Sequence, residues 1–533
     1  MTHIGRHPCD EALIRSAGAA SECSGATRRW VLVAAVIGSS MAFVDGTVVN
    51  VALPAIQREL DASAFDMQWI VESYALFLAA LLLVGGALGD RFGRRRIFIA
   101  GVALFAAASL GCALSRDVAQ LVATRAVQGI GGALLVPGSL ALISASFPED
   151  ERGSAIGTWS GFSGIAASLG PLVGGFLVDR YSWHWAFVLN IPLAAAALAI
   201  AWRHLPESRN PEAPARLDWS GAALATAGLS GIVFAFIEAP HRGWRSTEVL
   251  VALVAGVLSI ALFIVVEKRS ASPMFPLTLF RSRNFSGANL LTLLLYAALG
   301  GGLYFFPLDL IQVHGYSATA AGAALLPFIG LMFVLSRWAG KLVDRFGSKL
   351  PLVIGPAIAA AGFALFALPG LDGSYWTTYF PAVAVLGLGM TISVAPLTTT
   401  VMNALSQDVA GTASGVNNAV SRVASLLAIA VFGSVMAWRF GTGLDERLAA
   451  ANTPPDVTAF VQQQRDKLAG AGPPPAADAA VASAVRQAVG ASFVDGFRWV
   501  MLLCAGLALA SAASAWVLIE GRSASGAGNR APG

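Results

Sequence analysis

Charged residues are scarce in this chain. Asp, Glu, Lys and Arg make up only 12% of its 533 residues, whereas 56% are hydrophobic, and the mean hydropathy is +0.67. A soluble protein has roughly twice this charged fraction. The composition therefore excludes an ordinary soluble globular protein and predicts an integral membrane protein with many spans. The net charge is only +4, so we expect no nucleic-acid partner.

Cysteine and the common catalytic motifs are also lacking. Only four cysteines occur, and the spacing of Cys9 and Cys23 in the polar N-terminal tail fits no standard metal pattern. Free cytosolic thiols are expected there, with a tail metal site as the alternative. No GxxxxGKS/T, HExxH or GxSxG arrangement stands out. We therefore expect no enzyme, cofactor or metal, and energy drawn from an ion gradient, with H⁺ favoured and Na⁺ as the alternative.

Long apolar runs are what the sequence has in abundance. Runs of about 18 residues or more are long enough to cross a bilayer as a helix. They predict an all-α polytopic membrane protein. Fourteen such runs are found, at about 30–53, 67–88, 97–114, 118–144, 154–178, 184–203, 218–238, 248–266, 286–309, 318–343, 350–369, 378–400, 412–438 and 497–519.

The distribution of Lys and Arg predicts the orientation. An even number of spans places both termini on one side, where the tails and loops carry 21 Lys and Arg, against 5 in the short loops opposite. The positive-inside rule then puts both termini in the cytoplasm. The membrane itself is expected to be the cytoplasmic (inner) membrane of a bacterium. The long loop 439–496 is external. We expect a solvated, lid-like loop, with a docking surface for a periplasmic adaptor as the alternative.

An internal repeat divides the spans into two halves. "GALGDRFGRRR" (Gly86–Arg96) follows the second span and "GKLVDRFGSK" (Gly340–Lys349) follows the tenth. Internal symmetry of this kind is typical of transporters, whose site lies between the halves. The predicted organisation is a cytoplasmic tail 1–29, a six-helix bundle 30–203, an inserted helix pair 218–266, a second six-helix bundle 286–519 that includes the external loop, and a cytoplasmic tail 520–533.

The repeated loops are expected to act as a conformational latch on the cytoplasmic side. Gly89 and Gly93 permit a tight turn, and Asp90 is placed to cap a helix and to pair with Arg94. The alternative is that the arginines only anchor the topology. The expected latch residues are Gly86, Asp90, Arg91, Gly93, Arg94, Asp344, Arg345 and Gly347.

Five motifs together resemble the fourteen-span drug:proton antiporter family of the major facilitator superfamily. They are Asp45–Pro54, Gly86–Arg96, "LVATRAVQGIGGA" (121–133), "GPLVGG" (170–175) and "SWHWAFVLNIP" (182–192). Four residues before the fourth of these, Ala166 stands where the family usually has a glycine. The resemblance implies two six-helix bundles, alternating access and proton-coupled export, with Gly170, Pro171, Gly174 and Gly175 in the antiporter helix.

Asp45 is the charged residue of an otherwise apolar first span. An ionisable side chain at the centre of a membrane helix costs about 2.5–3.5 kcal/mol and usually faces a cavity. We expect Asp45 to carry protons or bind a cation, with a structural role as the alternative. Glu72, where the family more often has a small hydroxyl residue, is expected to be a second proton acceptor or to attract a cationic substrate. The alternative is that Glu72 lies at the outer opening of the cavity and simply stays hydrated.

Arg125 in the fourth span needs a buried acceptor, and Asp45 is a candidate. By resemblance, Arg125 takes part in proton coupling; the alternative is structural. Further residues are candidates for the substrate cavity. The alternative for Asp309 is a helix terminator on the loop side, and the alternative for Arg422 is that it satisfies helix carbonyls. The cavity candidates are Asn50, Gln128, Asp309, Asn417 and Arg422.

The resemblance implies a monomeric, proton-coupled exporter of lipophilic small molecules such as drugs, biocides and antibiotics, cationic compounds among them. Its expected partners are that substrate, protons and the lipid bilayer. One alternative is the export of an endogenous metabolite or lipid on the same fold. A membrane sensor that transports nothing is the other.

Overall fold

The computed structural model describes residues 25–209, 218–270, 273–405 and 410–520. Cys9 and Cys23 lie outside these ranges. Within them, fourteen helical segments are long and apolar enough to cross a membrane, which confirms the predicted number of spans and the all-α class. The chain is therefore a multi-pass membrane protein.

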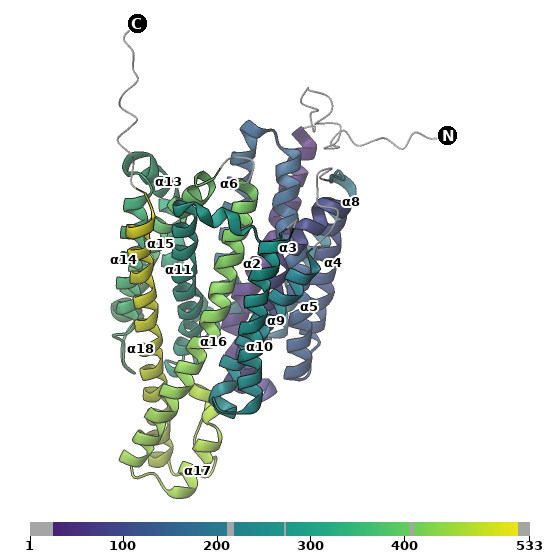
Figure 1. Cartoon of the computed structure of the whole chain (residues 1–533). Coiled ribbons are helices and arrows are strands. Elements are labelled where there is room, and N and C mark those ends of the chain that lie inside the picture. Colours follow the sequence, from purple (N-terminus) through teal and green to yellow (C-terminus); the bar gives the residue numbers. More distant parts are fainter. Residues whose placement is uncertain (1–24, 210–217, 271–272, 406–409, 521–533) are drawn as a thin grey trace. The chain divides into compact units, whose positions relative to one another are not determined.

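The helices follow one another with short connections (Figure 1). The first part of the chain contains α2 (Gly25–Leu60), α3 (Ala64–Phe92), α4 (Arg94–Ala113), α5 (Val118–Ser146), α6 (Glu149–Arg180), α7 (His184–Val188), α8 (Asn190–His204), α9 (Trp219–Arg242) and α10 (Thr247–Arg269). The second part contains η1 (Leu277–Arg281), α11 (Arg283–Leu308), the π-helix η2 (Asp309–Val313), α12 (Ala318–Ala323), α13 (Leu326–Phe346), α14 (Lys349–Phe366), α15 (Tyr375–Asn403), α16 (Ala410–Ala450), α17 (Pro455–Gln463), η4 (Arg465–Gly470) and α18 (Ala479–Leu518).

Two predicted spans are interrupted, and two are longer than their apolar runs. The sixth span consists of α7 and α8, which meet at Leu189, and the tenth begins with the short α12 before α13. Helix α16 continues to Ala450 and α18 starts at Ala479, so much of the predicted external loop 439–496 is helical. Alanine-rich sequence forms helix well even where it is too polar to span a bilayer.

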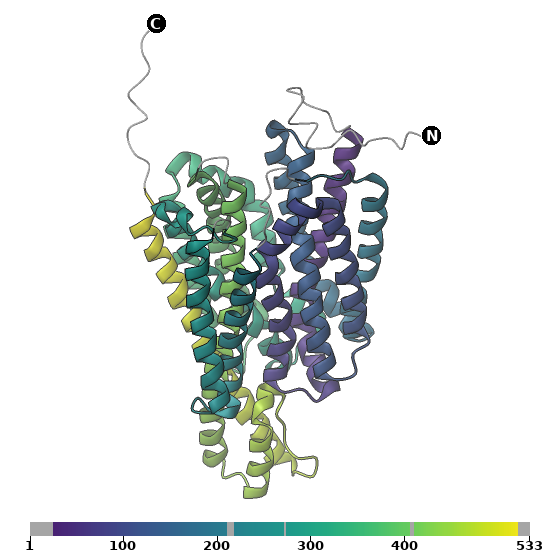
Figure 2. The ribbon, with the colours of Figure 1, turned by 45° about the vertical axis from the view of Figure 1, so that its right-hand side comes forward.

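The chain divides into two compact units, each described by itself. The first unit comprises residues 1–275, 306–323 and 437–493, and the second comprises residues 276–305, 324–436 and 494–533. In the first unit, the helices of residues 25–204 run alongside one another in both ribbon views (Figures 1 and 2).

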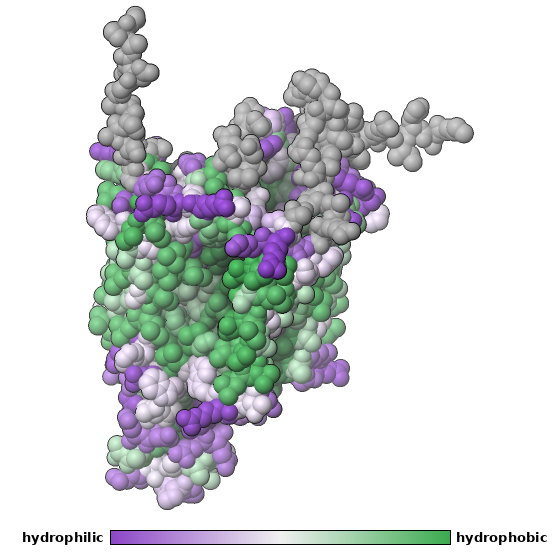
Figure 3. Space-filling model, viewed as in Figure 1, coloured by the Kyte–Doolittle hydropathy of each residue, from purple (hydrophilic) through white to green (hydrophobic). Residues whose placement is uncertain are grey.

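Helix α10 presents an apolar face to its surroundings. Val251, Val254, Val257 and Leu258 are all more than half exposed. Figure 3 shows hydrophobic surface along this helix, with hydrophilic residues near its ends. The opposite side of α10 packs on α9, where Gly256 lies against Gly228 and Gly231. Such a face, apolar outside and close-packed inside, suits lipid contact.

Glycines allow α4 and α5 to approach backbone to backbone. A Cβ atom on Gly131 of α5 would lie 2.7 Å from the amide nitrogen of Phe105 on α4, and one on Gly101 would lie 2.8 Å from the amide nitrogen of Leu135. Small residues at helix contacts are typical of membrane proteins. This contact brings the polar side chains of α4 within reach of those on α5.

We predict that Gly131→Ala destabilises the protein by about 1–3 kcal/mol, because the added methyl group meets backbone that cannot move aside. Gly161→Ala on α6 is the matched control, since no atom lies within 4 Å of its Cβ position. Thermal unfolding in detergent measures both. Equal melting temperatures for the two variants would contradict the close contact of α4 with α5.

Candidate functional site

Asp45 of α2 and Arg125 of α5 form a buried ion pair in the first unit. The Nη1 atom of Arg125 donates to Oδ2 of Asp45, and both side chains are almost completely buried, at 0% and 1% exposure. Leaving either charge unpaired in such a place costs several kcal/mol. The predicted partnership of Asp45 with Arg125 is thus present in the structure.

Gln128, one helical turn after Arg125, connects the two charges. Its Oε1 accepts from Nη1 of Arg125 at 2.7 Å, and its Nε2 donates to Oδ1 of Asp45 at 2.7 Å. The i, i+3 spacing on α5 places both side chains on one face, so that a single helix presents two donors to one carboxylate.

Tyr74 of α3 completes the surroundings of the guanidinium group. Its ring lies under Arg125, with 4.2 Å between Cζ and the ring centroid, and its hydroxyl donates to the carbonyl oxygen of Ala42 at 3.1 Å. The Nε atom of Arg125 donates to the carbonyl oxygen of Ile70 at 3.0 Å. These contacts hold the arginine on α3 as well as on α2.

Sequence reasoning missed Asn190 and Ser109. The Nδ2 atom of Asn190 donates to Oδ1 of Asp45 at 3.0 Å, and the Oγ atom of Ser109 accepts from Gln128 at 2.9 Å and from Asn190 at 3.3 Å. Both residues are completely buried. Asn190 could have been found by the signal that identified Asp45, a polar side chain inside a predicted span. Ser109 gives no such signal, because serine is common in membrane helices.

Glu72 of α3 is completely buried as well, and the structure gives it a different environment. Neither carboxyl oxygen has a hydrogen-bond partner among the described residues. A charged carboxylate without a partner is unfavourable in such surroundings, so this group is best accommodated as the neutral acid. The structure does not bring Glu72 into hydrogen-bond contact with Asp45 or Arg125.

The glycines of the predicted antiporter helix let α6 pack tightly on two neighbours. Gly170 and Gly174 lie against Thr47 and Val48 of α2, and Gly175 lies against the backbone of Ala318 in α12. Thr47 donates from Oγ1 to the carbonyl oxygen of Ala167 at 2.9 Å. Pro171 contributes to the same contact, since its carbonyl lies against Gly322 of α12. Helix α6 thus packs on α2 at Thr47 and Val48, two and three residues after Asp45.

The other four cavity candidates are described by their own surroundings. Asp309 is buried in the π-helix η2, where its Oδ2 lies 3.5 Å from Nδ1 of His314. Asn417 belongs to the second unit and donates to Thr292 at 2.7 Å and to Asn289 at 3.2 Å. Asn50 and Arg422 are half-buried on α2 and α16, and Oδ1 of Asn50 has no hydrogen-bond partner among the described residues. Of the five candidates, Gln128 has a hydrogen bond to Asp45.

The first latch loop contains the predicted ion pair. Arg94 lies 2.8 Å from Asp90, and Gly93 has a φ of 113°, a conformation that favours glycine. A Cβ atom on Gly86 would lie 3.6 Å from the Cβ atom of Pro137 on α5. Sequence reasoning missed Glu207, whose carboxylate accepts from the backbone N–H of Arg95 at 3.1 Å.

The second latch loop repeats part of this geometry. Arg91 and Arg345 each lie over the ring of the phenylalanine that follows, at 5.2 Å from its centroid. Gly347 has a φ of 73° and ends α13 as Gly93 ends α3. Asp344 lies in α13, and its side chain is outside the described ones.

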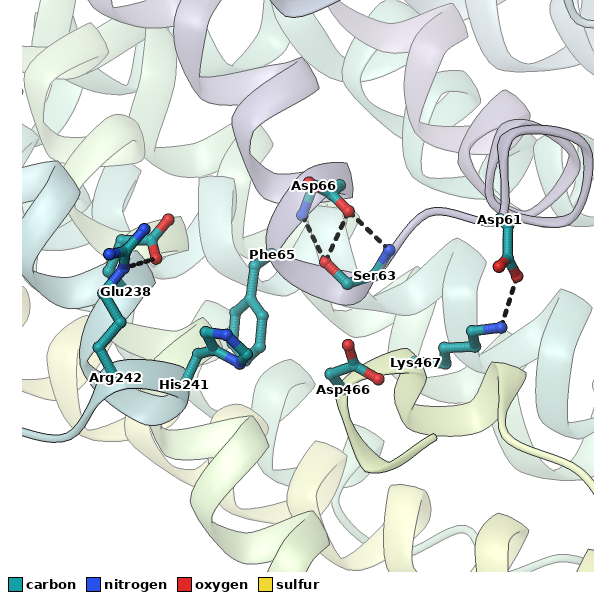
Figure 4. A pocket seen from close by; sticks show the side chains of 9 residues that line it. All are labelled: Asp61, Ser63, Phe65, Asp66, Glu238, His241, Arg242, Asp466 and Lys467. Atoms are coloured by element: carbon teal, nitrogen blue, oxygen red, sulfur yellow. Dashed lines mark hydrogen bonds and ion pairs between the residues drawn. The ribbon is translucent and has the colours of Figure 1, made fainter. Parts of the chain in front are cut away.

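A charged pocket lies within the first unit, lined by residues of α3 and α9, of the connection before α3 and of η4 in the predicted external loop (Figure 4). Lys467 of η4 pairs with Asp61 at 2.5 Å, and Gln57 of α2 donates to the carbonyl oxygen of Lys467 at 3.2 Å. The lining residues are Asp61, Ser63, Phe65, Asp66, Glu238, His241, Arg242, Asp466 and Lys467. Within the described ranges, no group of three or more His, Cys, Asp or Glu side chains is placed to hold a metal ion.

Known proteins share both the sequence pattern and the fold. Residues 35–429 match the family model described as Major Facilitator Superfamily. The chain is 36% identical over 494 residues to the tetracenomycin C resistance and export protein of Streptomyces glaucescens, covering 92% of this chain and 91% of that protein. It is 35% identical over 436 residues to the methylenomycin A resistance protein of Bacillus subtilis, covering 81% of this chain and 93% of that protein.

A third relative and a solved structure agree with these matches. The multidrug resistance protein Stp of Mycobacterium tuberculosis is 35% identical over 426 residues, covering 80% of this chain and 79% of that protein. The inward-facing crystal structure of a bacterial homologue of the human lysosomal transporter Spinster matches with a TM-score of 0.62 at 18% identity. It covers 92% of this chain and 98% of that one. At this identity the structural match concerns the fold alone.

We predict strong coupling between Asp45 and Arg125 in a double-mutant cycle. Asp45→Asn and Arg125→Gln should each destabilise the protein by about 3–5 kcal/mol, because each leaves a buried charge without its partner. The double variant should be more stable than the sum of the two losses by about 1–3 kcal/mol. Unfolding in detergent provides the four free energies, and additive effects would contradict the pairing.

We predict the opposite sign for Glu72. Glu72→Leu should stabilise the protein by about 1–3 kcal/mol, because it removes a buried carboxyl group that has no partner. Glu238→Leu is the matched control and should destabilise it, since Glu238 accepts from Trp69 at 3.2 Å and pairs with Arg242 at 2.7 Å. The measurement is the melting temperature of each variant compared with that of the parent protein. A comparable loss of stability in both would show that Glu72 has partners.

Proposed function

Because the chain belongs to the major facilitator superfamily, we propose that it exports lipophilic small molecules, cationic ones among them, in exchange for protons by alternating access. The observation that carries this proposal is the buried contact of Asp45 with Arg125 and Gln128. The names of the relatives support drugs and antibiotics as the substrate class, since they refer to resistance to tetracenomycin C, methylenomycin A and multiple drugs.

Asp45 is proposed to be the carboxyl group that exchanges protons. In the described state its two oxygens accept hydrogen bonds from Arg125, Gln128 and Asn190. A proton arriving from outside would neutralise it and weaken its hold on Arg125. The freed guanidinium group would then move relative to α2, which couples proton entry to a change in the bundle. Release of the proton to the cytoplasm would restore the pair.

Glu72 is proposed to be the second carboxyl group of the exchange. The two carboxyl groups differ in their hydrogen bonds: neither oxygen of Glu72 has a partner among the described residues, whereas the oxygens of Asp45 accept from Arg125, Gln128 and Asn190. In the proposed exchange, this difference would let one group pass a proton to the other or exchange it for a cation. Substrate binding at either group would compete with the proton.

Conformational roles are proposed for the latch loops and for α6. Breaking the Asp90–Arg94 pair would accompany the change of state, and the close contact of α6 with α2 would limit proton leakage beside Asp45. The remaining cavity candidates, Asn50, Asp309, Asn417 and Arg422, would contact the substrate.

The proposed setting is the cytoplasmic membrane of a bacterium, with both termini in the cytoplasm. One copy of the chain contains all of the proposed residues, so a monomer suffices. The loop 439–496, most of which belongs to the first unit, is external in this orientation. It is the surface on which a periplasmic adaptor would dock.

We predict that Asp45→Asn abolishes efflux driven by a pH gradient although the protein still inserts into the membrane, with transport compared per amount of inserted protein. The asparagine keeps the size of the side chain but cannot take up and release a proton. The measurement is proton flux and efflux of the lipophilic cationic dye ethidium in proteoliposomes, extended to neutral and anionic compounds to define the charge preference.

Asp117→Asn is the control for this experiment. Asp117 is exposed at the start of α5, where its side chain accepts from the backbone N–H of Gln120 at 2.8 Å, and asparagine caps a helix equally well. It should transport like the parent protein. Undiminished pH-driven transport by Asp45→Asn would overturn the assignment, and an absence of flux with every compound class would favour a membrane sensor that transports nothing.

A further inference from the structure

Asn190 lies at the interruption of the sixth span, where α7 has ended and α8 begins. Its side chain is completely buried, and Nδ2 points at two oxygens, Oδ1 of Asp45 at 3.0 Å and Oγ of Ser109 at 3.3 Å. The other end of the same amide, Oδ1, is buried and has no hydrogen-bond partner among the described residues. A buried amide oxygen without a donor costs free energy. A use for this oxygen in another state of the protein would explain its presence.

The hydrogen-bond capacity around Asp45 is arranged for one protonation state. Its carboxylate accepts from Arg125, Gln128 and Asn190, all of which act as donors here. A protonated Asp45 has an O–H group that must donate to something. A guanidinium group has no acceptor, and Oε1 of Gln128 already accepts from Arg125 at 2.7 Å.

The other titratable groups of the cluster are engaged elsewhere. Cys112 of α4 bonds to Oγ1 of Thr124 at 3.3 Å and lies 3.7 Å from Oε1 of Gln128. The hydroxyl of Tyr74 on α3 donates to the carbonyl oxygen of Ala42. The amide oxygen of Asn190 is therefore the acceptor in this cluster that has no donor of its own.

We propose that Asn190 is a positioning residue that serves Asp45 in both protonation states, an inference that rests on the proposed proton exchange at Asp45. With Asp45 ionised, Asn190 donates from Nδ2, as the structure shows. When a proton from the external water binds to Asp45, the amide turns half a revolution about its last side-chain bond and accepts from the new O–H group through Oδ1.

Ser109 fits both orientations of this amide. A serine hydroxyl can accept from an amide N–H or donate to an amide oxygen. In the described state its Oγ accepts from Asn190 and from Gln128. After the turn, the same hydroxyl can donate its own hydrogen to the side chain of Asn190. The pair thus requires no movement of α4 or α8 when the proton binds.

The test is a pH titration of the full chain in lipid vesicles, followed by infrared difference spectroscopy. The carbonyl band of a protonated carboxyl group is read directly, so no substrate is needed, and the band that disappears in Asp45→Asn is that of Asp45. In Asn190→Leu, which has a similar size but neither donor nor acceptor, we expect this band at higher wavenumber, because the O–H group has lost its acceptor. Proton-driven efflux of ethidium should fall about tenfold, the equivalent of one hydrogen bond.

Two further variants keep the test decisive. Asn190→Ala replaces Asn190→Leu should the latter not fold, with the same expected band shift. Asn190→Gln retains an amide one methylene further out and should keep the band near its position in the parent. Ser139→Ala is the control, because the Ser139 hydroxyl is buried on α5 and donates within its own helix, to Leu135 at 2.9 Å. It should change neither the band nor the efflux.

The two proposals fail in different ways. An Asp45 band that stays in place in Asn190→Leu and in Asn190→Ala overturns the role of Asn190 and leaves the proton exchange standing. A band that moves as far in Asn190→Gln as in Asn190→Leu also contradicts it, since the amide would then be irrelevant. A titration without any band that depends on Asp45 overturns both proposals.

Discussion

The buried ion pair between Asp45 and Arg125 is the contact on which the rest of the first bundle depends. Two opposite charges without access to water are stable only while they stay together and while their remaining donors and acceptors are satisfied. Arg125 therefore needs the carbonyl of Ile70 and the ring of Tyr74, and Asp45 needs Gln128 and Asn190. The pair thereby ties α2 to α3, α5 and α8, and any event that removes one charge loosens these contacts together.

The same bundle contains a carboxyl group for which this constraint is not met. Glu72 is as deeply buried as Asp45 and has no hydrogen-bond partner among the described residues. Evolutionary selection for stability alone would remove such a group, since an apolar side chain of similar size would cost less. Its presence is best understood as a functional cost. In the proposed proton exchange the two residues would divide the work, since Asp45 pairs with Arg125 and Glu72 supplies a second carboxyl group without such a partner among the described residues.

Much of this arrangement follows from single residues in the sequence, and the part that does not has a physical reason. A charge inside an apolar run is conspicuous, so Asp45 and Arg125 could be named and even paired, and the apolar runs fixed the number of spans correctly. Asn190 and Glu207 were missed because the role of each depends on a partner more than 100 positions away, although Asn190 is itself a polar residue inside a predicted span. Asp309 has its partner His314 only five residues further along the chain, and its place in the substrate cavity stays a prediction.

The repeated latch loops show how far local sequence determines local geometry. Both copies place an arginine over the next phenylalanine and end their helix with a glycine at positive φ. These features depend on adjacent residues and recur wherever the sequence recurs. The first copy also receives Glu207, which lies in the connection from α8 toward α9 and binds the start of α4 through the N–H of Arg95. A Cβ atom on Gly93 would collide with that carboxylate. Gly93 is thus needed for two reasons, its backbone conformation and the space that Glu207 occupies. Through Glu207, the connection that leads to the inserted helix pair is bound to the loop that is proposed to govern the conformational change.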